Sequence, residues 1–312
     1  MKIIVQMDPI ERLNLSGDST FALLLEAQER GYDIDIYTPN MLTLNDGLLS
    51  AEAQQIKAYH RPDRIEELNH PRSVLLDEYD IVLMRQDPPF DMSYITATHL
   101  LEIIQDKTLI LNNPFYVRNC PEKIFVNKYM KFMPHTLITR NISEIIKFRD
   151  EYKKIIIKPL YGNGGTNVFY SDDTDRNFGS IIENFMGLNN EPFIIQQFIP
   201  KVKEGDKRII LIDGEIVGAI NRLPQDGEIR SNMHVGGTAT KIGLSERDIE
   251  ICNTIGPTLR EKGQIFVGID VIGEFLTEIN VTSPTGLHEL ERFDGINAAS
   301  IIWNAIDEKL KV

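Results

Sequence analysis

The sequence contains little cysteine, few basic residues relative to acidic ones, and no long apolar run. The two cysteines among its 312 residues, Cys120 and Cys252, are too few for a disulfide framework and too far apart for a Cys-X-X-Cys metal site. Lys and Arg number 33 against 46 Asp and Glu, and the net charge of −13 argues against nucleic acid or a membrane surface as the main partner. No apolar stretch is long enough to span a bilayer, and the apolar start at residues 2–7 is too short for a secretion signal. We therefore expect a cytoplasmic protein with reduced thiols.

The first third of the chain alternates strand and helix patterns. Strands are predicted at residues 2–7, 33–37, 80–84 and 108–112, with helices after Asp18 and at 94–105, whereas residues 40–78 are too weakly patterned for a prediction. This alternation predicts a parallel sheet covered by helices, with ligands beyond the carboxyl ends of its strands. The polar segment 85–91 follows one of those strands.

From about residue 121 the pattern indicates antiparallel strands with added helices. Asp213-Gly214 is a strong two-residue hairpin signal, and a helix is predicted at 245–262. Further strands are predicted at 154–158, 166–170, 193–199, 207–213, 215–221, 265–272 and 276–281, and a last helix near 295–310. We place a domain boundary near residue 120.

A lysine followed by glycines is the first candidate site. Lys158 ends a predicted strand, and Gly162, Gly164 and Gly165 follow it. Glycines let several backbone N–H groups face one anion, and the lysine adds a positive charge, so the segment favours phosphate binding. The alternative is a hairpin in which glycine serves only the turn.

The second candidate site is a set of oxygen-bearing side chains, Asp270, Glu278 and Asn280, on two predicted strands. A three-residue loop at 273–275 would pair position 270 with 278 and gather all three on one face, which suits a hard cation such as Mg²⁺. A two-residue loop would place Asp270 and Glu278 on opposite faces. Polar residues on an exposed face remain the alternative.

Weaker signals surround these two sites. The strand end at 196–199 and the Asp206-Lys207-Arg208 cluster could face a nucleotide, or could be an ordinary strand end and a solvated charge cluster. The glycine-rich stretch 223–244 is a candidate lid, with disorder as the alternative.

Taken together, these strings resemble the bacterial-type glutathione synthetases of the ATP-grasp superfamily. The resemblance rests on their order along the chain: residues 7–10, 83–91, Glu122-Lys123, 158–165, 205–208 and 278–285. It implies an α/β (α+β) chain with a Rossmann-like pre-ATP-grasp domain at 1–120 and a two-lobed ATP-grasp domain at 121–312. The stretch 238–240 and His288 depart from the family pattern.

The same resemblance implies roles for individual residues. It implies Mg²⁺ or Mn²⁺ ligands at Asp270, Glu278 and Asn280, and catalytic roles for Arg208, Arg230 and Lys158. ATP would be bound by Lys123, Lys158, Gly162, Asn163, Gly164, Gly165, Gln196, Gln197, Phe198, Ile199 and Asp206. The acid substrate would meet Arg85, Asn232, Gly236, Gly237, Ser283 and Thr285.

The implied reaction is the ATP-dependent ligation of γ-glutamylcysteine with glycine through an acylphosphate, which gives glutathione, ADP and phosphate. The implied assembly is a homo-oligomer, commonly a tetramer. Two alternatives stay open on the sequence: an ATP-grasp ligase that joins a different acid and amine, and a nucleotide-binding regulator without turnover.

Overall fold

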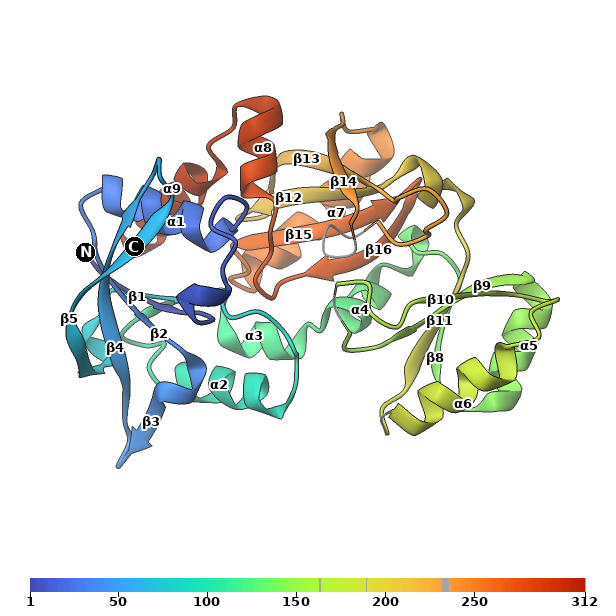
Figure 1. Cartoon of the computed structure of the whole chain (residues 1–312), viewed down its shortest axis with the longest axis horizontal. Coiled ribbons are helices and arrows are strands. Elements are labelled where there is room, and N and C mark those ends of the chain that lie inside the picture. Colours follow the sequence, from blue (N-terminus) through green and yellow to red (C-terminus); the bar gives the residue numbers. More distant parts are fainter. Residues whose placement is uncertain (163, 189, 232–235, 312) are drawn as a thin grey trace.

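Three β-sheets organise the chain (Figure 1). The computed structural model describes every residue except 163, 189, 232–235 and 312. One large sheet lies in the N-terminal part, and two antiparallel sheets follow it in the sequence.

The first sheet has a parallel centre, as predicted. Its strands lie in the order β3-β4-β2-β1-β6-β7, with β5 paired to β4. The segment without a prediction forms an antiparallel extension, because β4 pairs antiparallel with β2, β3 and β5. The strands are β1 (Lys2–Gln6), β2 (Asp33–Tyr37), β3 (Leu42–Asn45), β4 (Leu48–Tyr59), β5 (Arg64–Leu75), β6 (Ile81–Met84) and β7 (Leu109–Leu111).

Side-chain caps fix where the N-terminal helices begin. Asp18 accepts a hydrogen bond from the Phe21 backbone N–H at 2.8 Å, and Asp91 accepts one from Tyr94 at 2.9 Å, so each satisfies a free donor of the first turn. The Asp91 cap also defines the end of the 85–91 segment. The helices are α1 (Ser19–Glu29), α2 (Met92–Glu102) and α3 (Pro114–Asn119).

The second sheet, in the order β10-β9-β11-β8, forms a lobe with its own core of Ile145, Ile157, Phe185 and Phe193. Strand β10 begins at Phe169, so the predicted strand at 166–170 was placed too early. Gly164, Gly165 and Asn167 have positive φ, and the turn that they form delays strand pairing. The elements are α4 (Glu122–Phe125), β8 (Thr136–Thr139), α5 (Ile142–Tyr152), β9 (Lys154–Pro159), β10 (Phe169–Asp172), α6 (Phe178–Leu188) and β11 (Phe193–Gln197).

The third sheet is antiparallel in the order β14-β13-β12-β15-β16. The predicted hairpin is confirmed: Ile212 pairs with Glu215, and Asp213 and Gly214 have φ of 47° and 80° in a two-residue turn. The elements are β12 (Asp206–Ile212), β13 (Glu215–Leu223), β14 (Thr238–Lys241), α7 (Glu246–Glu261), β15 (Phe266–Ile272), β16 (Phe275–Asn280), α8 (Leu287–Asp294) and α9 (Ala298–Leu310).

The β15–β16 hairpin differs from its prediction in loop length. Ile272 pairs with Phe275, so the turn has two residues, and the three-residue loop was wrong. A β-bulge between Asp270 and Val271 then shifts the register by one residue, and Asp270 still pairs with Glu278. The bulge thus produces the pairing that the longer loop was expected to give.

The last helix packs against the beginning of the chain. Trp303 of α9 is fully buried, and its indole Nε1 donates to the Leu23 carbonyl of α1 at 2.9 Å. Residues from β1, α1, β12 and α9 share one apolar cluster, so the first and third sheets are joined through a common core.

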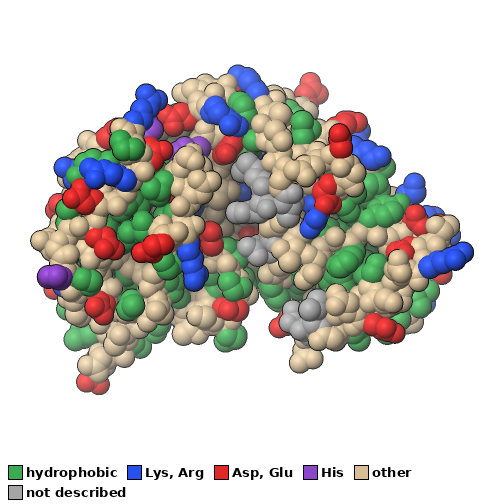
Figure 2. Space-filling view, viewed as in Figure 1, with side chains coloured by type: hydrophobic (Ala, Val, Ile, Leu, Met, Phe, Trp, Pro, Cys, Tyr) green, Lys and Arg blue, Asp and Glu red, His purple; other side chains and the backbone are tan. Residues whose placement is uncertain are grey.

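Across residues 1–311, the undescribed positions aside, no helix has the length and apolar character needed to cross a bilayer. Figure 2 shows acidic and basic side chains interspersed over one face of the molecule.

Candidate functional site

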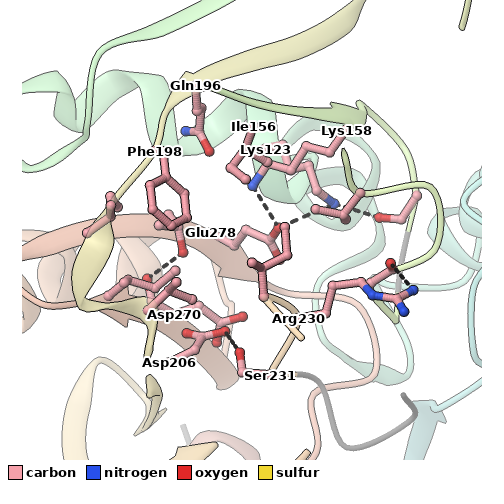
Figure 3. A pocket seen from close by; sticks show the side chains of 18 of the residues that line it. Lys123, Ile156, Lys158, Gln196, Phe198, Asp206, Arg230, Ser231, Asp270 and Glu278 are labelled. Atoms are coloured by element: carbon pink, nitrogen blue, oxygen red, sulfur yellow. Dashed lines mark hydrogen bonds and ion pairs between the residues drawn. The ribbon is translucent and has the colours of Figure 1, made fainter. Parts of the chain in front are cut away.

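A partly open cavity lies between the second and third sheets (Figure 3). One part of its lining is apolar and comes from Ile156, Val168, Phe198, Ile199, Val202 and Ile272. Another part carries charged side chains: Lys123, Lys158, Asp206, Arg230, Asp270 and Glu278. An apolar slot beside concentrated charge suits a ligand with a flat ring at one end and anionic groups at the other.

Two lysines from different elements meet at Glu278. Lys158 Nζ of β9 lies 3.4 Å from Glu278 Oε1, and Lys123 Nζ of α4 lies 3.6 Å from the same oxygen. Burial favours the neutral carboxyl, but the two ammonium groups outweigh it and hold the pKa of Glu278 below its ordinary value. Burial lowers the pKa of Lys158, whereas for Lys123 the nearby carboxylates overcome burial and raise the pKa.

The glycine-rich segment after β9 closes over these lysines. Lys123 Nζ donates to the Gly162 carbonyl at 2.6 Å, and Gly162, Gly164 and Gly165 all line the cavity. Arg230, in the loop between β13 and β14, donates to the Gly165 carbonyl at 3.4 Å. Asn163 lies outside the described residues, so its role in ATP binding stays a prediction.

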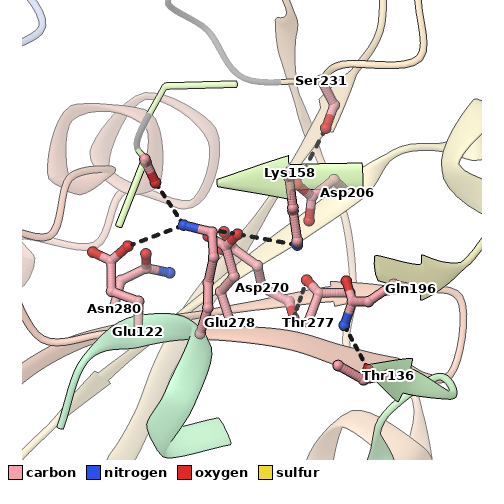
Figure 4. A network of polar contacts seen from close by, with 12 residues as sticks. Glu122, Thr136, Lys158, Gln196, Asp206, Ser231, Asp270, Thr277, Glu278 and Asn280 are labelled. Atoms are coloured by element: carbon pink, nitrogen blue, oxygen red, sulfur yellow. Dashed lines mark hydrogen bonds and ion pairs between the residues drawn. The ribbon is translucent and has the colours of Figure 1, made fainter. Parts of the chain in front are cut away.

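The end of β11 forms a wall of the cavity. Gln196, Gln197, Phe198 and Ile199 all line it, and their contact with adenine stays a prediction. Gln196 Nε2 donates to Thr136 Oγ1 at 2.9 Å, which holds the amide against β8 (Figure 4). The Phe198 ring meets Tyr170 edge-on at 5.0 Å between ring centroids, which fixes its orientation.

A network of buried charges extends from the wall of the cavity. The Asp270 carboxylate pairs with Arg208, at 2.9 Å from Nη2 and by a second contact from Nε, and also lies 2.9 Å from Arg222 Nη2. Arg222 pairs with Asp206 as well. Burial would raise the pKa of Asp270, but the two guanidinium groups outweigh it and lower the pKa. For Asp206, burial prevails over Arg222, and with the charge of Asp270 it raises the pKa to about 6.

Arg222 is a site residue that sequence reasoning missed. An unbroken register from the Asp213-Gly214 turn would place Asn221 opposite Asp206. The bulge between Ile210 and Leu211 shifts this register and brings Arg222 there. The sequence predicted the turn of the β12–β13 hairpin, but no residue pattern indicated the bulge within it. The position of Arg222 opposite Asp206 therefore could not be predicted.

Two more polar residues at the site were also missed. Ser231 is 3% exposed and donates to Asp206 Oδ2 at 3.1 Å (Figure 4). Glu122 accepts a hydrogen bond from Thr282 Oγ1 at 2.7 Å, and its burial raises its pKa. Both lie next to residues that the sequence had singled out, Arg230 and Lys123, and neither was given a role of its own.

Glycine at position 268 is required by the path of Arg208. A Cβ there would lie 2.8 Å from Arg208 Cδ and 3.2 Å from its Nε, closer than side chains tolerate. The bare backbone of β15 therefore lets the Arg208 side chain cross it and reach Asp270.

The predicted metal ligands share one face of the β15–β16 hairpin. Asn280 Nδ2 donates to the Gly268 carbonyl at 3.2 Å, so the amide oxygen is the atom that can coordinate a cation. Glu278 and Asn280 together fit a hard cation. Asp270, in contrast, has both carboxylate oxygens on guanidinium groups. Within the described part of the chain, no group of three or more His, Cys, Asp or Glu side chains is arranged to hold a metal ion.

The predicted acid-substrate residues lie in separate places. Arg85 is 6% exposed and donates from Nε to Thr20 Oγ1 at 3.1 Å, with a buried Nη1 that has no hydrogen-bond partner among the described residues. Ser283 donates to the Gln86 carbonyl at 2.6 Å, which joins the turn after β16 to the segment after β6.

The other members of this set are less constrained. Thr285 is half-buried beyond that turn. Gly236 accepts a hydrogen bond from Gln225 at 3.1 Å, and Gly237 follows it. Asn232 falls outside the described residues.

Comparison with known proteins agrees with this arrangement. Residues 1–118 match the family described as prokaryotic glutathione synthetase, N-terminal domain, and residues 122–295 match prokaryotic glutathione synthetase, ATP-grasp domain. The glutathione synthetase of Agrobacterium fabrum is 52% identical over 307 residues, which cover 98% of this chain and 96% of the relative. That of Brucella melitensis is 53% identical over 309 residues, or 99% of each chain.

Among solved structures, the D-cycloserine synthetase DcsG aligns with 99% of each chain at a TM-score of 0.70 and 13% identity, which shows a shared fold. The predicted fold class, a Rossmann-like N-terminal part followed by an ATP-grasp part, is confirmed.

Proposed function

This chain belongs to the prokaryotic glutathione synthetases, and on that premise we propose which residues perform each step of the ligation. It is an ATP-dependent ligase that joins γ-glutamylcysteine to glycine. The observation that carries the proposal is the convergence of Lys123, Lys158 and Glu278, from distant parts of the chain, on one cavity with an apolar slot.

ATP would lie with its adenine in the slot and its phosphates at the charged end. The backbone of residues 196–199 would frame the adenine, and Asp206 would accept hydrogen bonds from the ribose. Lys123, Lys158 and the glycine-rich segment would hold the phosphates, because buried cations and backbone N–H groups attract concentrated negative charge.

The reaction would proceed by two displacements. An oxygen of the cysteinyl carboxylate attacks the γ-phosphorus while the bond to the β,γ-bridging oxygen breaks, and ADP leaves. The glycine amine then attacks the acyl carbon of the acylphosphate, inorganic phosphate leaves with the former carboxylate oxygen, and the amine loses a proton. The cationic groups of Lys158, Arg208 and Arg230 would bring the two anions together and stabilise the charge that develops.

Magnesium or manganese would be held by Glu278 and Asn280, next to Asp270, and when bound it would neutralise phosphate charge and polarise the γ-phosphoryl group. In the absence of the ion, Lys123 and Lys158 neutralise Glu278. The chain thereby keeps this buried carboxylate ionised and available as a ligand.

A phosphate-release assay with each substrate omitted in turn tests the proposal. We expect phosphate release only when ATP, γ-glutamylcysteine and glycine are all present, with one glutathione formed per phosphate. Turnover with a different acid or amine in place of these would assign another ligase reaction. Nucleotide binding without phosphate release for any pair would indicate a regulator.

Nucleotide affinity should weaken as pH falls below about 6, the pKa of Asp206. Ribose hydroxyls donate to the ionised carboxylate, so protonation of Asp206 competes with binding, and affinity is full above that pKa. At one pH unit below this pKa, the Kd for ADP should be about tenfold higher than at neutral pH.

Calorimetry from pH 5 to 8 would measure this step. The Asp206→Asn variant should bind ADP more weakly and show a smaller pH dependence, which separates Asp206 from the titration of ADP itself. An unchanged pH profile in the variant would contradict the ribose assignment.

A homotetramer is proposed for the assembly on the resemblance alone, and light scattering of the purified chain would measure it. The domain boundary near residue 120 and the cytoplasmic location likewise stay predictions.

A further inference from the structure

Two stacked aromatic side chains connect a loop that follows the first sheet to a loop that follows the second sheet. The rings of Phe90 and Tyr161 have centroids 6.1 Å apart and planes inclined by 23°. Phe90 lies between β6 and α2, at the end of the 85–91 segment. Tyr161 follows β9 and directly precedes Gly162.

Tyr161 lies in the sequence between two residues that line the nucleotide cavity, Lys158 and Gly162. Lys158, three residues before it, faces Glu278, and Gly162, immediately after it, accepts the hydrogen bond from Lys123. The position of the Tyr161 backbone therefore bears directly on Gly162, which belongs to the segment that is proposed to hold phosphate.

Phe90 is held firmly by the first sheet and its helices. Its ring packs on Tyr94 of α2 at 5.4 Å between centroids, and Asp91 caps the same helix. At the other end of the segment, the Asp87 backbone N–H donates to Asp8 Oδ2 at 2.7 Å. Phe90 thus offers a fixed platform for the Tyr161 ring.

The stack also borders two further cavities. Phe90 and Tyr161 both line a pocket that contains Glu122 and Thr282, and both line a second pocket that contains Met92 and Phe193. Tyr161 itself is 40% exposed, and among the described residues its hydroxyl makes no hydrogen bond. The ring of Tyr161 contacts Phe90, and this contact is its main side-chain interaction, because the residue is not buried in a core.

We propose that Tyr161 is a positioning residue that couples the 85–91 segment to the glycine-rich phosphate segment through its stack on Phe90. Ordering of one segment then favours the productive arrangement of the other, so the acid substrate and the nucleotide bind with positive cooperativity. This inference rests on the proposed function, because it takes the 85–91 segment as part of the acid-substrate site.

The test compares substrate coupling in matched variants. In the wild type, γ-glutamylcysteine should lower the Kd for a non-hydrolysable ATP analogue, and by reciprocity the analogue should lower the Kd for the dipeptide by the same factor. Tyr161→Ala should reduce this factor and raise the KM for γ-glutamylcysteine about threefold to tenfold, the size expected for one aromatic pair, with a smaller effect on kcat. Tyr161→Phe should retain the coupling because it keeps the ring.

A double-mutant cycle assigns the effect to the stack. Tyr161→Ala combined with Phe90→Ala should lose no more coupling than the stronger single variant, and Phe90→Leu serves in place of Phe90→Ala should the alanine variant unfold. The matched control is Phe115→Ala, which removes another exposed aromatic ring, 41% exposed and 5.0 Å from Tyr116. This control should leave the coupling unchanged.

Additive effects of the two alanine substitutions, wild-type coupling in Tyr161→Ala, or loss of coupling in Tyr161→Phe would each overturn the inference. A wild type that released no phosphate with γ-glutamylcysteine and glycine would instead overturn the proposed function, so the two failures can be told apart.

Discussion

Replacing Glu278 by glutamine should lower kcat at least ~100-fold, the scale on which a lost preorganised electrostatic group acts. Glutamine keeps the shape but removes the charge that lies within 3.4 Å and 3.6 Å of two lysine ammonium groups. It also removes an anionic ligand from the proposed cation site. Steady-state phosphate release at increasing Mg²⁺ would measure both effects.

The control for this variant lies in the same hairpin. Glu274 is exposed in the turn between β15 and β16, and Glu274→Gln should retain wild-type turnover. Near-normal kcat of Glu278→Gln at saturating Mg²⁺ would rule out Glu278 as the metal ligand.

Replacing Arg222 by methionine should reduce the free energy of unfolding by about 3–5 kcal/mol, because it leaves two neighbouring buried carboxylates without a shared cation. Arg222 is 4% exposed and contacts both Asp206 and Asp270. Methionine fills much of the same volume, so the loss of stability comes mainly from removal of the positive charge. Urea unfolding at neutral pH would measure it.

Two further variants make this result specific. Arg222→Met combined with Asp206→Asn should recover part of the stability, since the carboxylate that loses its guanidinium partner is gone, whereas Asp270 keeps its pair with Arg208. Arg260→Met removes an arginine whose side chain is 45% exposed and that pairs with Glu215 on the surface, and should cost less than about 1 kcal/mol. Equal losses for Arg222→Met and Arg260→Met would contradict the role of Arg222 as a buried bridge.

The sequence was most informative where local chemistry decides the structure. The parallel strands around β1, the Asp213-Gly214 turn and the glycine-rich segment each follow from residue patterns within a few positions. The grouping of Lys123 with Lys158 at the cavity was suggested by the family resemblance, since nothing in their spacing brings α4 next to β9.

Register irregularities explain most of what could not be predicted. The bulge at Asp270 compensated for a wrong loop length, whereas the bulge near Ile210 hid Arg222. Both depend on how strands pack against their neighbours, and such packing leaves no periodic signal. Burial of Arg85 beside Thr20 likewise results from the approach of α1 to β6, which a single segment of sequence does not encode.

The contact between Trp303 and α1 has a consequence for synthesis on the ribosome. The apolar cluster that contains Ile3, Leu23 and Ile81 is completed only by side chains from the third sheet, α8 and α9, up to Ile306. A nascent chain that has just exposed its first hundred residues therefore presents an unfinished apolar surface. Emergence of the third sheet, α8 and α9, and not of the first sheet alone, supplies the side chains that complete this cluster.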